Sequence, residues 1–421
     1  MTTTTTVRGF HSKRGGSGSV FEEIYLVAGK RTPFGKYCGS LASLSPTDLG
    51  IFSSRAVLAE AKIPAADIDQ TIVANIGQAS ADSFFLPRHI ALYSGAPLET
   101  PALLVQRICG SGLEVIGQAA EQIAIGKAQV VLGCGTESMS RFPLVSYGAR
   151  QGFPLGKPEF LDLLWEALND TAAMPMGQTA DQLAKKMNLT RREVDTFAER
   201  SQFRYQEAQA AGFFRDEIVP VPKAGSFEAP DLKPRKFRAK EALDRDEHPR
   251  PTSLAQLGLL PPVFSPDGPT TAGSASGIVD GSCSLILASG EYVRARGLKP
   301  LARILGYAAV GVEPGLMGIG PSPAIRTLLA QLQIPLSQID RFEINEAFGA
   351  QCLAVARDLE LDEAKLNVNG GAIALGHPLA ATGLRLALTA ARVLRRDEKR
   401  LAVAAACIGG GQGIALALER A

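Results

Sequence analysis

The sequence predicts an α/β protein of two or three domains, in which helices pack on buried, mostly parallel strands. Of the 421 residues, 46% are hydrophobic and only 6% are aromatic, and Ala, Gly, Leu and Val dominate the apolar set. This composition suits small-residue strands covered by helices on both faces. The chain is also too long for one ordinary domain.

Residues 1–20 are expected to form a disordered N-terminal extension. They are rich in Thr, Gly and Ser, contain Arg8, Lys13 and Arg14 but no acid, and lack a long apolar run. The basic, acid-poor composition favours a transit peptide. The Gly/Ser run at residues 15–19 would break a targeting helix and favours a simple extension.

A first α/β half is expected at residues 21–140, where strands at 23–28, 71–75 and 129–133 alternate with helices. An apolar strand at about residues 278–290 should complete this half.

The character of the chain changes between these two parts. Residues 141–277 carry charged helices at 181–187 and 191–209, with proline-rich turns between them. We expect this stretch to be an inserted, mainly helical loop domain that caps the site. Residues 291–421 then repeat the α/β pattern as a C-terminal half.

Cys109 lies in a glycine-rich turn, Gln106–Leu113, directly before an amphipathic helix. The helix is predicted from apolar residues that recur at helical spacing, namely Leu113, Ile116, Ala120 and Ile123. Its N-terminal amides would point back at the thiol, and their partial positive charge favours the thiolate. Taken alone, the segment fits a buried structural cysteine equally well.

Three further segments place polar groups in similar settings. Asn345 opens an Asn-Glu-Ala-Phe run before a predicted helix, and His377 lies between Gly376 and Pro378 before another. Cys407 ends a small-residue run that is predicted to be a buried strand followed by glycines. Each residue alone has a structural explanation, as a helix cap or a buried side chain. Open α/β folds, however, build their sites where strand ends meet helix starts.

With these motifs the chain resembles the thiolases, in particular the 3-ketoacyl-CoA thiolases of fatty-acid oxidation. The resemblance covers about everything after the first twenty residues and includes ordered motifs at residues 29–35, 135–140, 174–180, 246–251 and 271–277. It implies a thiolase-like fold, in which two similar α/β halves form a layered αβαβα core. Direct self-similarity between the halves is weak, so the repeat rests on the resemblance.

The resemblance implies a role for each reactive residue. Cys109 is the nucleophile that becomes acylated, and Cys407 protonates or deprotonates the acetyl α-carbon. His377 takes the proton from Cys109 and donates toward the thioester oxygen, at an oxyanion site that Asn345 completes through a water. The backbone N–H groups of Cys109 and Gly409 form a second oxyanion site. A thiol suits proton transfer near neutral pH because its unperturbed pKa is about 8.5.

The same resemblance implies the binding residues. Arg250 and Ser276 are expected to contact coenzyme A, and Met176 and Phe348 are expected to border the acyl pocket. Coenzyme A is expected as a substrate, with no permanently bound cofactor.

The chain departs from the family pattern at a few positions near the site. Ala380 stands where glycine is usual, and Thr382 stands where serine is common. Ser274 and Val279 replace the commoner asparagines of the coenzyme-A loop. The threonine retains a hydroxyl that can cap a helix.

Composition limits the partners and the compartment. The net charge of +2 argues against a nucleic-acid binder, and no segment is long and apolar enough to span a bilayer. Six cysteines without a close C-x-x-C pair suit a reducing compartment, expected to be the cytoplasm, or the mitochondrial matrix if residues 1–20 are a transit peptide.

Two smaller expectations concern metals and charge. The four histidines have no second ligand at zinc-like spacing, so no metal site is expected. The basic cluster at residues 233–240 is expected to be a solvated hairpin face. The resemblance also implies a homodimer or homotetramer.

The leading function is an acetyl-CoA C-acyltransferase that cleaves 3-ketoacyl-CoA with coenzyme A into acyl-CoA and acetyl-CoA. A biosynthetic, acetoacetyl-CoA-forming acetyl-CoA acetyltransferase stays open, because chain length and direction do not follow from the residues. A decarboxylating condensing enzyme would need a different partner in place of Cys407. A non-catalytic acyl-CoA-binding protein would not need all four reactive residues, and the cysteine spacing disfavours a redox or metal-binding protein.

Overall fold

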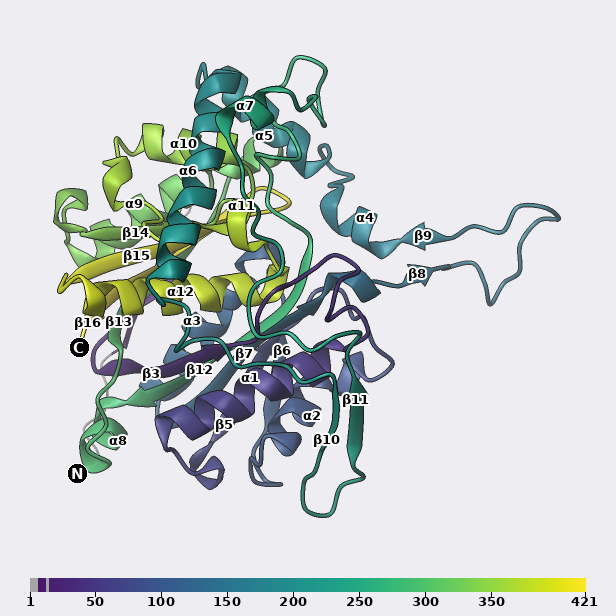
Figure 1. Cartoon of the computed structure of the whole chain (residues 1–421). Helices are drawn as coiled ribbons and strands as arrows, with labels where there is room; N and C mark the ends of the chain where they lie inside the picture. Colours follow the sequence, from purple (N-terminus) through teal and green to yellow (C-terminus); the bar gives the residue numbers. More distant parts are fainter. Residues whose placement is uncertain (1–6, 13–14) are drawn as a thin grey trace.

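The computed structural model describes residues 7–12 and 15–421. Its main sheet has twelve strands, nine of them in the continuous order β14-β15-β16-β13-β3-β12-β7-β5-β6 (Figure 1). The first half of the sheet contains β3 (Ile24–Arg31), β12 (Val279–Ser289), β7 (Val130–Ser138), β5 (Gln70–Ala74) and β6 (Ala102–Val105). The second half contains β13 (Ala302–Gly311), β16 (Gln412–Arg420), β15 (Leu401–Ile408) and β14 (Arg341–Ile344).

The two halves repeat one strand pattern. In the first, β3 and β12 are antiparallel, β12 and β7 are antiparallel, and β7 and β5 are parallel. In the second, β13 and β16, β16 and β15, and β15 and β14 follow the same pattern of directions. The halves join where Ala302 and Arg303 of β13 pair with Leu26 and Tyr25 of β3. The predicted fold of two similar α/β halves is confirmed.

Helices fill the space between the halves and cover their outer faces. The helices α3 (Ser111–Ala124) and α12 (Leu379–Arg396) pack on each other at the centre, within the largest apolar core. Three helices, α1 (Pro46–Ala61), α2 (Leu86–Tyr93) and α8 (Gly290–Ala295), cover the first half. On the second half lie α9 (Pro321–Leu332) and α10 (Gly349–Asp358). The result is the expected αβαβα layering.

Residues 141–277 contain α4 (Leu163–Leu168), α5 (Met176–Lys186), α6 (Arg191–Ala210) and α7 (Leu254–Gly258). They also form two hairpins, β8 (Leu144–Val145) with β9 (Leu161–Asp162) and β10 (Ala224–Phe227) with β11 (Arg235–Arg238). Figure 1 shows the β8–β9 hairpin extending away from the body of the molecule. The helices α5 and α6 pack on α10 of the second half, whereas Phe227 and Phe237 of the β10–β11 hairpin pack with residues of α1 and α2 in the first half.

The predicted disorder of residues 1–20 is wrong for the part that the structure describes, and residues 1–6 and 13–14 lie outside it. Strands β1 (Val7–Ser12) and β2 (Gly16–Phe21) form a hairpin, and β2 pairs with β13. The glycines that suggested disorder allow this pairing, because a Cβ on Gly18 would lie 2.9 Å from Ala308 Cα. The Ser19 hydroxyl also donates to Glu121 at 2.7 Å.

Two other expectations need correction. The strand predicted at 129–133 continues to Ser138, because Gly135 lets α12 pack directly on β7: a Cβ there would lie 2.7 Å from Leu384 Cδ1. The basic cluster at residues 233–240 is not wholly solvated. Arg235 bonds to Asp48 at 2.6 Å and to Asp82 at 2.7 Å, and so ties the hairpin to α1.

Candidate active site

The candidate site lies where the two central helices begin. The helices α3 and α12 touch through backbone, since a Cβ on Gly112 would lie 2.7 Å from the N atoms of Gly383 and Leu384. Two glycines at the crossing allow an approach that larger side chains would prevent. Cys109 precedes α3 and His377 precedes α12, so this contact brings the two residues together.

Cys109 lies in the short helical turn η3 (Ile108–Gly110), buried just before α3. Ile108 has a φ of 42°, a left-handed conformation that is costly for a β-branched residue. The turn is held by the Ser111 hydroxyl, which accepts from Arg107 N and donates to Ile108 O, both at 2.7 Å. The thiol is therefore presented by a tight, strained turn.

Two backbone groups act on the Cys109 sulfur. Burial raises the pKa of the Cys109 thiol to about 11, although the N–H groups of Gly409 and of Cys109 itself act to lower it. The backbone N–H groups favour the thiolate, as predicted, but burial favours the neutral thiol more strongly. The thiol is neutral at rest and needs a base.

His377 offers that base. Its Nδ1 lies 2.6 Å from Thr382 Oγ1, whose single proton is donated to Pro378 O at 3.1 Å. The hydroxyl must therefore accept from Nδ1–H, which leaves the lone pair on Nε2. Burial and the charge of Arg385 lower the pKa of His377 to about 3, so the ring is neutral. A neutral imidazole with a free Nε2 can accept a proton.

Asn345 faces the same imidazole nitrogen. Its Nδ2 donates to His377 Nε2 at 3.3 Å, and its Oδ1 is buried without a partner among the described residues. Asn345 lies after β14, four residues before α10 begins at Gly349, rather than at the helix start itself. The adjacent Glu346 fixes this segment by accepting from Ser201 Oγ, Asn367 Nδ2 and Ile373 N.

Cys407 lies in β15, one residue before the strand ends. The end of β15 touches the η3 turn, because a Cβ on Gly110 would lie 2.5 Å from Ile408 Cδ1. Burial raises the pKa of Cys407, and a charge on Cys109 raises it further. The two thiols are therefore near neighbours, and Cys407 is also a neutral thiol at rest.

Apolar side chains surround Cys407. It shares a small cluster with Met176, Met317 and Ala347, against which Ile108 and Phe348 also pack. A Cβ on Gly409 would lie 2.1 Å from the methyl carbon of Met176, so a larger residue there would push this flexible side chain aside. Phe348 also makes an edge contact with Phe264, with ring centroids 5.6 Å apart. These residues form an apolar wall beside the thiols.

The residues expected to bind coenzyme A lie beside this wall. The backbone of Ala275 pairs with Phe348, and Ser276 N donates to Ala347 O at 3.0 Å. Gly277 O accepts from His377 N at 2.9 Å. The Arg250 guanidinium is exposed and lies 3.1 Å from His248 Nε2, whose ring packs over Gly277. The loop at 274–277 thus connects Arg250 to the His377 turn.

Two residues beside the site were not predicted from the sequence. Thr382 was expected only to cap a helix, yet its hydroxyl sets the tautomer of His377. Glu137 of β7 is fully buried and accepts from Asn75 Nδ2, Gly77 N and Ala380 N, which anchors the start of α12. A hydroxyl five residues after a histidine, on the first turn of its helix, is the signal that could have revealed Thr382.

Within residues 7–12 and 15–421, no group of three or more His, Cys, Asp or Glu side chains is arranged to hold a metal ion. Over the same residues, no helix is long and apolar enough to cross a membrane.

Comparisons with known proteins identify the family of this chain. The N-terminal domain model of thiolase matches residues 24–291, and the C-terminal domain model matches residues 298–420. The human mitochondrial 3-ketoacyl-CoA thiolase is 45% identical over 399 residues, which cover 94% of this chain and 98% of the relative. A beta-ketoadipyl-CoA thiolase of Pseudomonas knackmussii is 41% identical over 410 residues, covering 94% and 99%.

Solved structures give the same result. The human mitochondrial 3-ketoacyl-CoA thiolase in complex with CoA has a TM-score of 0.88 at 44% identity, covering 94% of this chain and 98% of that one. The Bacillus anthracis acetyl-CoA acetyltransferase has a TM-score of 0.89 at 37% identity, covering 96% and 100%. Because both domain models match in order and these relatives align over almost their whole length, the chain belongs to the thiolase family and is an acyltransferase of that family.

Proposed function

We propose that this thiolase cleaves 3-ketoacyl-CoA with coenzyme A, through an acyl-enzyme on Cys109 and with Cys407 as acid and base. The observation that carries the proposal is the meeting of two buried thiols and a neutral imidazole where α3 and α12 cross. A single thiol and a histidine would serve acyl transfer alone. A second thiol supplies the proton that carbon–carbon cleavage requires.

In the first half-reaction, His377 Nε2 takes the proton of the Cys109 thiol. The thiolate attacks the 3-keto carbon, and the C2–C3 bond then breaks with its electron pair remaining on C2. Cys407 gives its proton to C2, which releases acetyl-CoA and leaves the acyl group on Cys109. The N–H groups of Cys109 and Gly409 bind the oxyanion in this proposal, and their effect on the Cys109 sulfur supports that role.

In the second half-reaction, the Cys407 thiolate takes the proton of the coenzyme A thiol. The coenzyme A sulfur attacks the acyl carbonyl, and the Cys109 sulfur leaves and recovers its proton from His377. Protonated His377 donates toward the thioester oxygen during this exchange, and Asn345 completes this oxyanion site through a water. Their present bond of 3.3 Å supports a shared role.

The acyl group is proposed to be apolar and to lie against Met176 and Phe348. The support is the cluster around Cys407, which contains methionine, isoleucine, alanine and phenylalanine side chains and no charged one. A free carboxylate at the end of the acyl chain, such as the name beta-ketoadipyl-CoA implies for one relative, would be buried there without a partner, which is costly.

Coenzyme A is proposed to lie along the 274–277 loop, with Arg250 at its phosphate end and Ser276 nearer the thioester. The human relative was solved in complex with CoA, which supports coenzyme A itself as the ligand. The exposed guanidinium of Arg250 suits a phosphate group, and the link from Gly277 O to His377 N leads from this loop to the reacting atoms.

The test is thiolysis by purified wild type, Cys109→Ser and Cys407→Ser, with a short and a medium-chain 3-ketoacyl-CoA. Cleavage by the wild type that is lost in both variants is expected. Retained cleavage in Cys407→Ser would exclude the two-thiol mechanism.

The ratio of the cleavage rates for the short and the medium-chain substrate distinguishes this function from the biosynthetic alternative. An acetoacetyl-CoA-forming acetyltransferase, which the Bacillus anthracis structure favours by its name, would act on acetoacetyl-CoA and reject the medium chain. Binding of both substrates without cleavage would instead indicate a non-catalytic acyl-CoA-binding protein.

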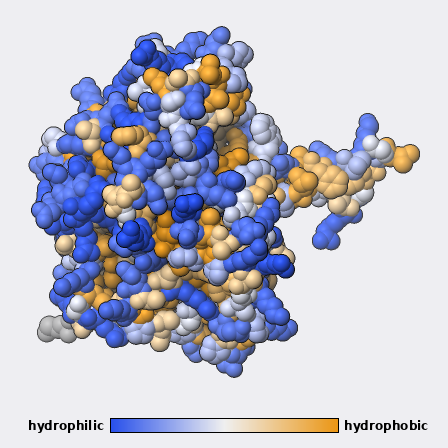
Figure 2. All heavy atoms as spheres, viewed as in Figure 1, coloured by the Kyte–Doolittle hydropathy of each residue, from blue (hydrophilic) through white to orange (hydrophobic). Residues whose placement is uncertain are grey.

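We propose that the enzyme is a homodimer or homotetramer. Large apolar side chains on the β8–β9 hairpin and after it are exposed, namely Leu144, Tyr147, Leu155, Phe160 and Trp165. Figure 2 shows this protruding arm with many hydrophobic side chains on its surface. Such a patch favours burial against another copy. Light scattering of the wild type and of Leu144→Asp/Phe160→Asp tests this, and a monomeric wild type would exclude it.

We propose a cytoplasmic location, with the mitochondrial matrix as the alternative. Residues 7–12 and 16–21 belong to the sheet, which supports their retention in the folded enzyme rather than removal as a targeting segment. Six free cysteines suit either reducing compartment. Cell fractionation with an antibody against the N-terminal strands distinguishes the two.

A further inference from the structure

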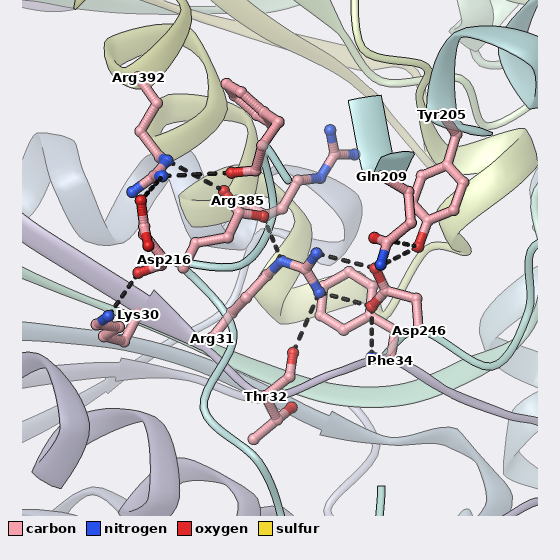
Figure 3. A network of polar contacts seen from close by, with 12 residues as sticks. Lys30, Arg31, Thr32, Phe34, Tyr205, Gln209, Asp216, Asp246, Arg385 and Arg392 are labelled. Atoms are coloured by element: carbon pink, nitrogen blue, oxygen red, sulfur yellow. Dashed lines mark hydrogen bonds and ion pairs between the residues drawn. The ribbon is translucent and has the colours of Figure 1, made fainter. Parts of the chain in front are cut away.

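Arg31, the last residue of β3, is fully buried and pairs with two buried carboxylates. Its Nη1 and Nη2 donate to the two oxygens of Asp246 at 2.6 and 2.9 Å, and its Nε donates to Glu217 at 2.6 Å. Figure 3 shows this pair of parallel bonds within a wider polar network. A planar guanidinium that binds a carboxylate through two bonds fixes its orientation as well as its distance. Asp246 is therefore held in one place relative to β3.

The Asp246 carboxylate also fixes the backbone around it. Its Oδ1 accepts from Phe34 N at 2.8 Å, and its Oδ2 accepts from the Tyr205 hydroxyl of α6 at 3.2 Å. The N–H of the next residue, Glu247, donates to Phe34 O at 2.9 Å. The Glu247 carboxylate accepts from Ser40 N and Ser40 Oγ at 3.1 and 3.0 Å. Asp246 and Glu247 are thus tied both to the segment after β3 and to α6.

Arg250 stands four residues after Asp246, at the exposed end of the same segment. Its N–H donates to Gln202 Oε1 at 3.3 Å, and Gln202 is a buried residue of α6. Between the two ends, the His248 ring packs over Gly277 and its Nε2 lies 3.1 Å from the Arg250 guanidinium. The backbone of the segment is therefore fixed at both ends, whereas the guanidinium of Arg250 faces solvent. The buried part determines where the exposed cation lies.

The free energy of ion pairing is a weak explanation for the Arg31 network. Burial of a guanidinium and two carboxylates removes their hydration, and apolar side chains often stabilise such a place equally well. The network does supply a fixed geometry between β3 and residues 246–250. Such geometry matters where an arginine is proposed to bind phosphate, because a group that is already held in place loses less conformational freedom when its ligand binds.

We propose that Arg31 and Asp246 are positioning residues for the nucleotide end of coenzyme A, because they hold the segment that presents Arg250. The inference rests on the proposed function, in which Arg250 lies at the phosphate end of coenzyme A. The groups that bond the Asp246 carboxylate belong to Arg31, Phe34 and Tyr205, which are not reacting groups. The network therefore acts on the affinity for coenzyme A and not on the chemical step.

The test compares two acyl acceptors in thiolysis, coenzyme A and pantetheine, which lacks the nucleotide and its phosphates. Asp246→Asn removes the charge that Arg31 binds and keeps the size of the side chain. We expect the KM for coenzyme A to rise at least about fivefold, while kcat and the kcat/KM for pantetheine change less than about twofold. Glu23→Gln is the matched control and should resemble the wild type, because Glu23 also binds an arginine, Arg294, through two bonds of 2.7 and 3.1 Å, but at an exposed site.

A double variant separates positioning from a general loss of stability. Arg250→Met removes the guanidinium itself and should raise the KM for coenzyme A about tenfold. If Asp246 acts through Arg250, Asp246→Asn/Arg250→Met should have the same KM as Arg250→Met alone. A general loosening of the fold would instead multiply the two effects and would lower the activity with pantetheine as well.

Equal losses with coenzyme A and pantetheine, or effects that multiply in the double variant, would overturn the proposal. If Asp246→Asn does not fold, Tyr205→Phe replaces it, because this variant loses the hydroxyl that donates to Asp246 and keeps the ring stacked on Phe214. It should show the same difference between the acceptors, with a KM for coenzyme A about twice that of the wild type. An unchanged KM would again overturn the proposal.

Calorimetric titration with coenzyme A distinguishes failure of this inference from failure of the proposed function. A wild type that binds coenzyme A but cleaves no 3-ketoacyl-CoA would refute the proposed function, and the affinity of Asp246→Asn for coenzyme A would still test the positioning role. An active wild type whose KM for coenzyme A is unchanged in Asp246→Asn refutes only this inference.

Discussion

The strands β7 and β15 occupy the same place in the two halves, and each holds a buried cysteine, yet only one of these thiols lies in the candidate site. Cys134 lies in the middle of β7, covered by α1 and α2, with its sulfur 3.6 Å from Ser282 Oγ. Cys407 lies one residue before the end of β15, beside the η3 turn. The position along the strand, rather than the residue type, thus decides which thiol meets the other reactive groups.

The central helices α3 and α12 also show that position in the fold decides which residues meet. Each begins just after a candidate reactive residue, Cys109 before α3 and His377 before α12, and the glycine contact brings these two starts together. The first half supplies one thiol, whereas the second supplies the imidazole, the amide and the second thiol. The proposed activity therefore belongs to the junction and to neither half alone, although their strand pattern is the same.

The largest expected effect is the difference in activity loss between variants of Cys407 and Cys134. Cys407→Ala should lower kcat/KM for thiolysis by at least about a thousandfold, because a reacting group is removed. Cys134→Ala should change it less than about twofold, since only a small buried side chain is trimmed. Steady-state kinetics of both purified variants measure this. Similar losses in the two would contradict the distinction between strand middle and strand end.

The second prediction concerns the helix crossing. A Cβ at Gly383 would lie 2.6 Å from Gly112 C, which is backbone and cannot turn aside. We expect Gly383→Ala to lower the free energy of unfolding by about 3 kcal/mol and to separate Cys109 from His377. Gly258→Ala is the control, because Gly258 lies in α7 with open space around it and should be neutral or slightly stabilising. If chemical denaturation gives Gly383→Ala and Gly258→Ala the same free energy of unfolding, the close contact between α3 and α12 is dispensable.

The third prediction tests how α12 orients its histidine. Thr382→Val removes the acceptor of the His377 Nδ1 proton and should lower kcat about ten- to a hundredfold, since the ring loses its fixed tautomer. Thr382→Ser should keep most of the activity. Thr389→Val is the control on the same helix, because its hydroxyl is buried without a partner among the residues that the structure describes, and its loss should not affect kcat. A Thr382→Val enzyme with wild-type kcat would mean that other contacts set the tautomer.

Much of this arrangement could be predicted from the sequence. The glycine-rich turn at Cys109, the His-Pro step at His377 and the apolar run before Cys407 gave the neighbouring helices and strands, and the resemblance joined them into one site. Contacts between residues distant in sequence could not be predicted. No periodicity reveals that Arg385 faces Glu343, or that Gly112 meets Gly383, because such pairs depend on how the layers pack.

The N-terminal error has a similar cause. Residues 7–12 and 16–21 have a composition typical of a flexible extension, yet β2 pairs with the edge that β13 exposes. That edge provides the hydrogen-bonding partners that the segment lacks by itself, and the glycines permit close approach. Local composition therefore predicted the wrong state, because a tertiary partner determines it.

The smallest expected effect is the pH dependence of stability that His377 contributes. Burial and then Arg385 lower its pKa to about 3, below the value of about 6.5 in an unfolded chain. The unfolded state therefore binds more protons below pH 6.5, so stability falls as the pH drops, by about 1 kcal/mol from pH 6.5 to 5.5. His377→Gln should remove this part of the pH dependence, whereas His11→Gln, an exposed residue of β1, should leave it intact. Urea denaturation at the two pH values measures the difference. If the free energy of unfolding changes with pH in His377→Gln as it does in the wild type, the fold does not hold the imidazole of His377 neutral.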